Sequence, residues 1–304
     1  MISELSILMP CYNNECYELV AGLHAQAESI ISSGRALRYE IVVADDGSTD
    51  AAIVARNRRI DTLPGCRYVL RSRNTGRAAI RNFLARTAGY GWLLFIDSDM
   101  SLRNASFISN YISLDGVDVV YGGYTVGGDD GTMKGNLRYE YESKYNRNSV
   151  AEKRRCSPYD GFHTSNFLIR RDIMLANPFD ERFRRYGYED VLFGKSLKQA
   201  GVSISHVDNT LSFEDFETNS GFVAKTEEGI ATLCDFRDEL RGYSPLITLG
   251  DRICRLRLQP AVRLFFKTFA RSIKNNLTGN KPNLLLFNIY KLGMYCSMCG
   301  RKQR

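Results

Sequence analysis

Two aspartates, Asp97 and Asp99, follow a run of apolar residues and stand one residue apart in the chain. The run at 92–96 is rich in aromatic and branched side chains, which is typical of a strand buried on both faces. Alternate residues of an extended segment point to the same side, so the two carboxylates can converge on one hydrated divalent cation, or on a cation and a hydroxyl group. The alternative is a turn that caps a helix beginning near Ser101. The tripeptide by itself is compatible with both.

Two further pairs of acidic residues stand where strands end or helices begin. Asp45 and Asp46 follow a second apolar run, and Glu189 and Asp190 come directly before a predicted helix. The free N–H groups and the positive dipole end of a helix N-terminus stabilise carboxylates. Helix capping is therefore the alternative to a catalytic role for Glu189 and Asp190.

The hydrophobic periodicity predicts a scaffold that would bring these acids together. Apolar runs alternate with segments of helical periodicity through the first hundred residues, which is typical of a mostly parallel sheet with right-handed crossovers. The expected strands are 5–9, 39–44, 66–70, 92–96, 117–121, the end of 159–171, and 202–207. The expected helices include 15–32, 78–87, 133–150, one that follows residues 186–190 and ends at 200, and 220–240. Flexible or loop segments are expected at 122–131 and 211–217. The fold class is thus α/β and Rossmann-like, with helices flanking the central sheet. In such sheets ligands bind outside the carboxyl ends of the strands, where Asp97 and Asp99 would stand.

Two common nucleotide-binding motifs are missing from the sequence. No G-x-G-x-x-G follows the first expected strand, and no G-x-x-x-x-G-K-[ST] occurs anywhere in the chain. Dinucleotide-binding and P-loop functions therefore lose their main support. The predicted site is acidic where those folds use glycine-rich phosphate cradles.

The composition indicates a folded cytoplasmic protein. With 304 residues, 44% hydrophobic and 25% charged, the chain is long enough for one large domain or for a domain with an appendage. No stretch reaches the roughly 18 uninterrupted apolar residues of a membrane span, and residues 1–4 lack the basic start of a signal peptide. The eight cysteines show no secreted-type framework, so we expect reduced thiols, including Cys296 and Cys299 on a terminal helix.

The C-terminal tail accounts for the net charge of +7. Residues 251–304 contain twelve Lys or Arg and one acid, interleaved with bulky apolar residues. We therefore expect a domain at 1–242 and a basic amphipathic helical extension at 243–304 that binds an anionic membrane, at the inner face of the cell membrane. The alternative is a helical hairpin packed on the domain. Nucleic acid is not the expected partner, because it would leave the apolar residues uncovered.

Five short motifs resemble the bacterial family 2 glycosyltransferases, which have the GT-A fold. They occur in the family's order within residues 3–240, and they are Pro10-x-Tyr12-Asn13, Asp45-Asp46-Gly47-Ser48, Asn74-x-Gly76 with Arg81-Asn82, Asp97-Ser98-Asp99, and Glu189-Asp190. Each motif is weak alone, and their order and structural context make the signal specific. The resemblance implies an enzyme that transfers a sugar from a nucleotide-diphosphate donor to a hydroxyl group.

The resemblance also implies how the donor is held. The turn at Pro10 and Tyr12 and the pair Asp45 and Asp46 would hold the nucleobase, since a tyrosine face stacks on a uracil-like ring and a carboxylate accepts its N–H. Which of the two aspartates contacts the base stays open.

The remaining motifs would hold the ribose and the diphosphate. Asp97 would bind the ribose, and Asp99 would ligate Mn²⁺ or Mg²⁺ at the diphosphate. Gly76 and Arg81 belong to the same nucleotide-binding set, with Arg77 or Arg81 adding charge near the phosphates. The alternative for these arginines is a place on the solvent-facing side of their helix.

The family pattern gives the role of general base to Asp190, with Glu189 helping to place the acceptor. A single displacement then inverts the anomeric centre. The implied reaction moves a hexose or N-acetylhexosamine from a UDP-linked donor to a glycan or a lipid-linked acceptor, as in polysaccharide biosynthesis.

The sequence departs from the family pattern at one metal contact. Many relatives carry a histidine shortly after the last strand, where this chain has Phe213, Glu214 and Asp215. Either an acid replaces the imidazole or the protein supplies fewer metal ligands. His163 is expected to be an acceptor-site residue or a hydrogen-bonded surface group.

Two other functions remain as alternatives. A nucleotidyltransferase has a similar sheet but carries a glycine-rich basic loop after the first strand, and a non-catalytic binding module would have no need of both Asp99 and Asp190. The products formed from a sugar nucleotide distinguish the three classes: a nucleoside diphosphate, pyrophosphate, or none.

Overall fold

The computed structural model describes residues 1–146 and 149–299, and the chain forms two compact units. Unit 1 comprises Met1–Gly127, Asn148–Arg184 and Glu189–Asp215, and unit 2 comprises Gly128–Arg147, Arg185–Tyr188 and Phe216–Arg304. Each unit is described by itself. Residues 243–304 fall within unit 2, and their expected role as a separate extension stays a prediction.

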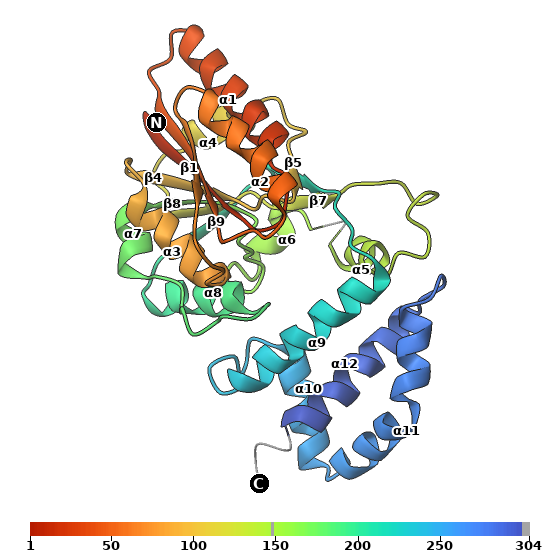
Figure 1. Ribbon diagram of the computed structural model, residues 1–304. Helices are drawn as coiled ribbons and strands as arrows, with labels where there is room; N and C mark the ends of the chain where they lie inside the picture. The colour runs from red at the N-terminus through yellow and green to blue at the C-terminus, as the bar shows by residue number, and fades with distance from the viewer. Residues whose placement is uncertain (147–148, 300–304) are drawn as a thin grey trace. The chain divides into compact units, whose positions relative to one another are not determined.

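In the described part of the chain, unit 1 is built on a seven-stranded sheet with helices on both faces (Figure 1). Its strands, in spatial order, are β3 (Cys66–Leu70), β2 (Arg38–Asp45), β1 (Glu4–Cys11), β4 (Trp92–Ile96), β8 (Asn166–Arg170), β6 (Val119–Tyr121) and β9 (Ile204–His206). β3, β2, β1 and β4 are parallel, β6 and β9 are parallel, and β8 runs antiparallel between β4 and β6. The predicted α/β class with a mostly parallel sheet is confirmed.

The helices of unit 1 fill the crossovers between these strands. They are α1 (Tyr17–Ser32), α2 (Ala51–Asn57), the 3₁₀ helix η1 (Arg58–Thr62), α3 (Arg77–Thr87), α4 (Phe107–Ile112), α6 (Ala151–Arg155), α7 (Arg171–Ala176) and α8 (Glu189–Gln199). α1 and α2 connect β1 to β2 and β2 to β3, whereas α3 returns from β3 to β4 and covers the other face of the sheet (Figure 1). Because both faces are covered, the central strands β1 and β4 are buried along almost their whole length.

A second, smaller sheet joins segments that were predicted to be loops. β5 (Met100–Ser101) pairs antiparallel with β10 (Leu211–Phe213), and β10 pairs parallel with β7 (Tyr124–Val126). The predictions for 122–131 and 211–217 were wrong at these strands, because pairing between distant segments of three residues leaves no local periodicity. The small sheet sets Phe213 opposite Met100 and so brings the end of β10 next to Asp99.

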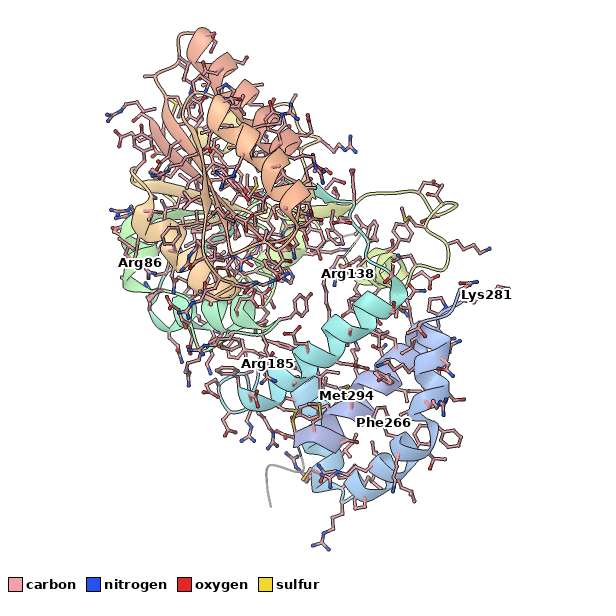
Figure 2. All side chains as sticks on the ribbon, in the orientation of Figure 1. Arg86, Arg138, Arg185, Phe266, Lys281 and Met294 are labelled. Carbon is pink, nitrogen blue, oxygen red and sulfur yellow. A yellow bond between two sulfur atoms is a disulfide. The ribbon has the colours of Figure 1, made fainter. Side chains whose placement is uncertain are left out.

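The elements of unit 2 are helices. They are α5 (Leu137–Tyr145), α9 (Asn219–Asp235), α10 (Pro245–Arg255), α11 (Gln259–Leu277) and α12 (Leu284–Cys299). α5 is shorter than the helix predicted at 133–150, of which residues 147–148 lie outside the described ones. Buried side chains from α5, α9, α11 and α12 form one core: Leu137, Phe222, Val223, Ile273, Leu277, Phe287 and Tyr290. Phe266 and Met294, both labelled in Figure 2, are partly buried and pack against this core.

A disulfide joins Cys234 of α9 to Cys299 of α12. The expectation of reduced thiols was wrong for this pair, because the two residues are 65 positions apart and only the packing of the helices brings them together. Cys296, one turn earlier on α12, is free and buried. Within residues 1–146 and 149–299, none of the helices has the length and apolar character needed to cross a membrane.

Candidate active site

The turn after β1 is tied to the turn after β2 through Asn13. Its side-chain oxygen and its backbone N–H form hydrogen bonds of 2.7–3.1 Å with residues 48–50. Asn13 has φ 47°, a left-handed conformation that asparagine tolerates better than most residues. These bonds hold the turn with Pro10 and Tyr12 beside residues 45–46, and the Tyr12 side chain remains 46% exposed. The predicted nucleobase residues thus lie at one edge of the sheet.

Asp45 and Asp46 are both buried and both hold neighbouring turns. Asp45 Oδ1 accepts the backbone N–H of Ser48 at 2.7 Å, in the turn after β2, and its Oδ2 accepts a hydrogen bond from the hydroxyl of Tyr68 on β3. Asp46 Oδ2 accepts from the backbone N–H groups of Thr75 (2.8 Å) and Gly76 (2.9 Å), and its Oδ1 accepts from the Thr75 hydroxyl (2.8 Å). Asp46 therefore fixes the loop between β3 and α3, and a contact of either aspartate with a nucleobase stays a prediction.

Gly76 stands at the N-terminus of α3 with φ 93°, where a side chain would be strained. A Cβ atom there would also lie 3.2 Å from the backbone Cα and O atoms of Arg184. Glycine therefore lets this loop pass close to the segment before α8. The N-terminus of α3, with Arg77 exposed beside it, lies at the carboxyl edge of the sheet, where helix N–H groups favour anions.

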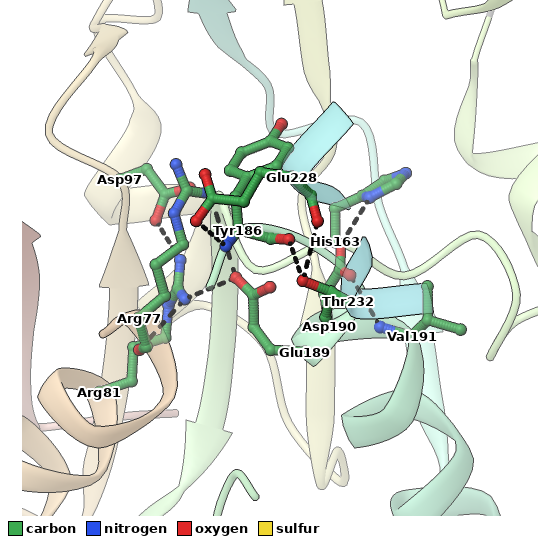
Figure 3. Close-up of polar contacts among 10 residues, drawn as sticks. All are labelled: Arg77, Arg81, Asp97, His163, Tyr186, Glu189, Asp190, Val191, Glu228 and Thr232. Carbon is green, nitrogen blue, oxygen red and sulfur yellow. Dashed lines mark hydrogen bonds and ion pairs between the residues drawn. The ribbon is translucent and has the colours of Figure 1, made fainter. Parts of the chain in front are cut away.

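Arg81 of α3 is the buried centre of the site, only 1% exposed. Its Nη2 donates to Asp97 Oδ1 at 2.6 Å, and its Nη1 donates to Glu189 Oε1 at 3.4 Å (Figure 3). Arg77 Nη1 lies 4.0 Å from the same Glu189 oxygen. One guanidinium thus joins the carboxylate that follows β4 to the carboxylate that begins α8. The sequence had left open a solvent-facing position for Arg81, and this alternative was wrong because the side chain is buried.

Asp99 lies between β4 and β5 and is partly exposed. In the described ranges there is no group of three or more His, Cys, Asp or Glu side chains that could hold a metal ion. Glu214, a possible replacement for the missing histidine, pairs with Arg103 at 2.9 Å and 2.5 Å, and Asp215 Oδ2 lies 3.5 Å from Asn14 Nδ2. Both alternatives left by the sequence, an acid in place of the imidazole or fewer protein ligands, stay predictions.

Glu189 and Asp190 form the first turn of α8. Asp190 Oδ1 accepts the Val191 N–H at 2.8 Å, and its Oδ2 lies 3.1 Å from His163 Nδ1 (Figure 3). Burial opposes the ionisation of Asp190, but the His163 hydrogen bond and charge and the Val191 N–H outweigh it, so the pKa of Asp190 lies below its usual value. Burial raises the pKa of Glu189 above its usual value, against the attraction of the two arginines. Two adjacent carboxyl groups with separated pKa values are suited to different roles.

For His163 the sequence left two roles open, an acceptor-site residue or a hydrogen-bonded surface group, and it did not show the contact with Asp190. It precedes β8, 27 positions before Asp190, and no local pattern connects the two residues. Only the antiparallel placement of β8 beside β4 brings its loop to the start of α8.

The sequence of the chain is similar to those of known glycosyltransferases. The sequence model of the family described as Glycosyl transferase family 2 matches residues 6–175. An uncharacterized glycosyltransferase of Haemophilus influenzae is 33% identical over 103 residues, covering 33% of this chain and 38% of the relative. A chondroitin synthase of Escherichia coli is 25% identical over 257 residues, covering 70% of this chain and 35% of the relative. The chain therefore spans less than two fifths of the length of these curated relatives.

Comparison with solved structures shows the fold. A mannosyltransferase from Pyrobaculum calidifontis, in complex with GDP-Man and Mn²⁺, superposes with a TM-score of 0.54 at 16% identity, covering 98% of this chain and 86% of that one. At this identity the likeness concerns the fold alone.

Proposed function

Since the chain belongs to glycosyl transferase family 2, we propose that it transfers a sugar from a nucleotide-diphosphate donor to a hydroxyl group of a glycan or a lipid-linked acceptor. The family match confirms the resemblance read from the motifs. The observation that carries the proposal is the buried guanidinium of Arg81, which holds Asp97 and Glu189 together at the carboxyl edge of the sheet. The three side chains meet where Asp97 follows β4 and Glu189 begins α8, at the edge of the sheet where ligands bind in open α/β folds.

The donor would bind along this edge. Tyr12 offers an exposed ring for stacking on the base, and Asn13 ties its turn to the turn that follows Asp45 and Asp46. Asp97, oriented by Arg81, would accept a hydrogen bond from the ribose. We propose a UDP-linked hexose or N-acetylhexosamine as donor and polysaccharide synthesis as the setting, which the name of the Escherichia coli relative supports.

Asp99 would hold the divalent cation, Mn²⁺ or Mg²⁺. It is partly exposed after β4, and among the described residues no cluster of three or more ligating side chains surrounds it. This fits cations of the Mg²⁺ type, which bind one or two carboxylates and keep water and substrate phosphates as their other ligands. When bound, the cation would supply the charge that stabilises the departing nucleoside diphosphate.

Asp190 would act as the general base. Its carboxylate would take the proton of the acceptor hydroxyl while the acceptor oxygen attacks the anomeric carbon and the bond from that carbon to the diphosphate breaks. One displacement of this kind inverts the anomeric centre. The lowered pKa of Asp190 keeps the group ionised at neutral pH, and Glu189, held by Arg81, would help to place the acceptor.

The test is product analysis with a panel of nucleotide sugars in the presence of Mn²⁺. Release of a nucleoside diphosphate that depends on an added glycan or lipid-linked acceptor supports the proposal. Pyrophosphate as product would favour a nucleotidyltransferase, and donor binding without any product would favour a binding module. NMR of the product's anomeric proton distinguishes inversion from retention.

We also propose that unit 2 binds an anionic membrane, namely the inner face of the cell membrane. Ile273 and Leu277 of α11 are buried in the core of unit 2, so they are not available to lipid. Five bulky residues of α10, α11 and their junction are 47–67% exposed: Leu256, Leu258, Leu264, Phe265 and Phe269. Five exposed cations of the same segments have no acidic partner among the described residues: Arg252, Arg255, Arg257, Lys267 and Arg271. Apolar groups beside unpaired cations suit the boundary of an anionic bilayer, where each cation adds about 1 kcal/mol.

Liposome sedimentation tests this partner with point variants, because removing residues 243–304 would open the core of unit 2. The wild type should pellet with phosphatidylserine-containing vesicles at low salt and be released in part at high salt. A variant with Leu264, Phe265 and Phe269 changed to serine should stay in the supernatant. Leu175→Ser, at an exposed leucine of α7 in unit 1, is the matched control and should pellet like the wild type. A wild type that stays in the supernatant would remove the membrane from the proposal, and equal pelleting of all three proteins would show that these three residues are not the membrane contact.

A further inference from the structure

Asp190 is held by donors from two different elements. One oxygen accepts the backbone N–H of Val191 on α8 at 2.8 Å, and the other lies 3.1 Å from Nδ1 of His163 in the loop before β8. An ionised carboxylate only accepts hydrogen bonds, so Nδ1 of His163 carries the proton. With one oxygen tied to its own helix and the other to the loop, the carboxylate cannot rotate without losing a bond (Figure 3).

The imidazole of His163 is itself kept in place. The rings of Tyr121 on β6 and Tyr124 on β7 contact it edge-on, each with a centroid separation of 6.1 Å. Tyr121 is buried, whereas the His163 side chain is 43% exposed. Among the described residues, Asp190, Tyr121 and Tyr124 are titratable groups in contact with the ring, and His206 on β9, which packs against Tyr121, is close enough for an electrostatic interaction with it. The ring is thus supported by the sheet on one side and open on the other.

We propose that His163 is a positioning residue for glycosyl transfer, which fixes the Asp190 carboxylate in the orientation that takes the acceptor's proton. The inference rests on the proposed function, because it requires Asp190 to be the base. A base displaced by about 1 Å loses on the order of 10²-fold in rate, so a single orienting hydrogen bond has a measurable effect on turnover. The donor is bound by other residues, so its affinity should not depend on His163.

Two variants separate orientation from the other effects of the ring. His163→Ala removes the N–H group that forms the hydrogen bond to Asp190, whereas His163→Asn can place an amide N–H near the position of Nδ1. We expect His163→Ala to lower kcat by about 10- to 100-fold with the donor KM changed less than about twofold, and His163→Asn to recover most of that loss. The pH profile provides a second readout: without the imidazole the pKa of Asp190 should rise, so the acid limb of kcat/KM moves to higher pH in both variants.

Asp190→Asn is the reference that separates this inference from the proposed function. If Asp190→Asn turns over like the wild type, the base assignment fails whatever His163 does. If Asp190→Asn is inactive but both His163 variants match the wild type in kcat and in pH profile, the positioning role is overturned. Equal loss in His163→Ala and His163→Asn with an unmoved acid limb would overturn it too, because the ring would then act through its shape. Should His163→Ala fail to fold, judged by Trp92 fluorescence, the pH profile of His163→Asn decides.

Discussion

Replacing Arg81 by methionine should destabilise unit 1 strongly. Methionine retains much of the buried aliphatic volume and removes the charge, so the change isolates the ion pairs to Asp97 and Glu189. Glu189 is 5% exposed and would be left as a buried carboxylate without its closest cation. Breaking a buried pair in this way costs about 3–5 kcal/mol, a large part of a typical total stability of about 5–15 kcal/mol.

Urea unfolding followed by fluorescence provides the measurement, because Trp92 is the sole tryptophan of the sequence and begins β4, five residues before Asp97. The control is Arg86→Met on the same helix (Figure 2). Arg86 pairs with Glu181 at 3.6 Å, but both side chains are at least half exposed, and such surface pairs contribute about 0–1 kcal/mol. A loss for Arg81→Met no larger than that for Arg86→Met would refute the central role given to this guanidinium.

The pH dependence of this loss has a definite sign. The pKa of Glu189 is raised in the folded protein, so the stability linked to its neutral form is present at low pH and is lost as the pH rises through the folded pKa. Without Arg81 that pKa rises further. The difference between Arg81→Met and the wild type should therefore be smaller at pH 5 than at pH 8, and Glu189→Gln combined with Arg81→Met should recover part of the loss. An equal difference at both pH values would show that the ionised form of Glu189 is not what Arg81 stabilises.

The remaining predictions concern chemistry and cross-linking. Asp190→Asn should keep donor binding, measured by calorimetry, and lower turnover by about 10²–10⁴-fold, because an amide cannot accept the proton; turnover within a few-fold of wild type would leave Asp190 as a helix cap only. Asp99→Ala should weaken donor binding and abolish the response to Mn²⁺, and EDTA should reproduce this in the wild type, whereas full activity in EDTA would exclude a metal at Asp99. Reduction of the Cys234–Cys299 disulfide, or replacement of both cysteines by serine, should lower the stability of unit 2 by about 2–4 kcal/mol in chemical denaturation. The reason is that a closed loop of this length restricts the unfolded chain. Unchanged unfolding under reducing conditions would count against the bond.

The sequence alone was sufficient for the alternation of strands and helices in unit 1. The strands at 66–70 and 92–96 were predicted to the residue. For 92–96 the reason is burial on both faces, which produces a continuous apolar run that can be recognised without knowing its neighbours. The position of the acids at strand ends and at the start of α8 followed from the same boundaries. Family membership was also readable, since the order of short motifs is itself a property of the sequence.

Tertiary structure decided which of these residues act on one another. The sequence showed Arg81 on a helix but not that this side chain turns inward to Asp97 and Glu189, and it showed His163 in a loop but not its contact with Asp190. In the C-terminal helices it showed an apolar and basic mixture, while only packing decided that Ile273 is buried and Phe265 is exposed. The spacing of apolar residues shows which side of a helix or strand is buried. The pairing of residues that are far apart in the chain depends on how those segments pack, and no local pattern in the sequence contains that information.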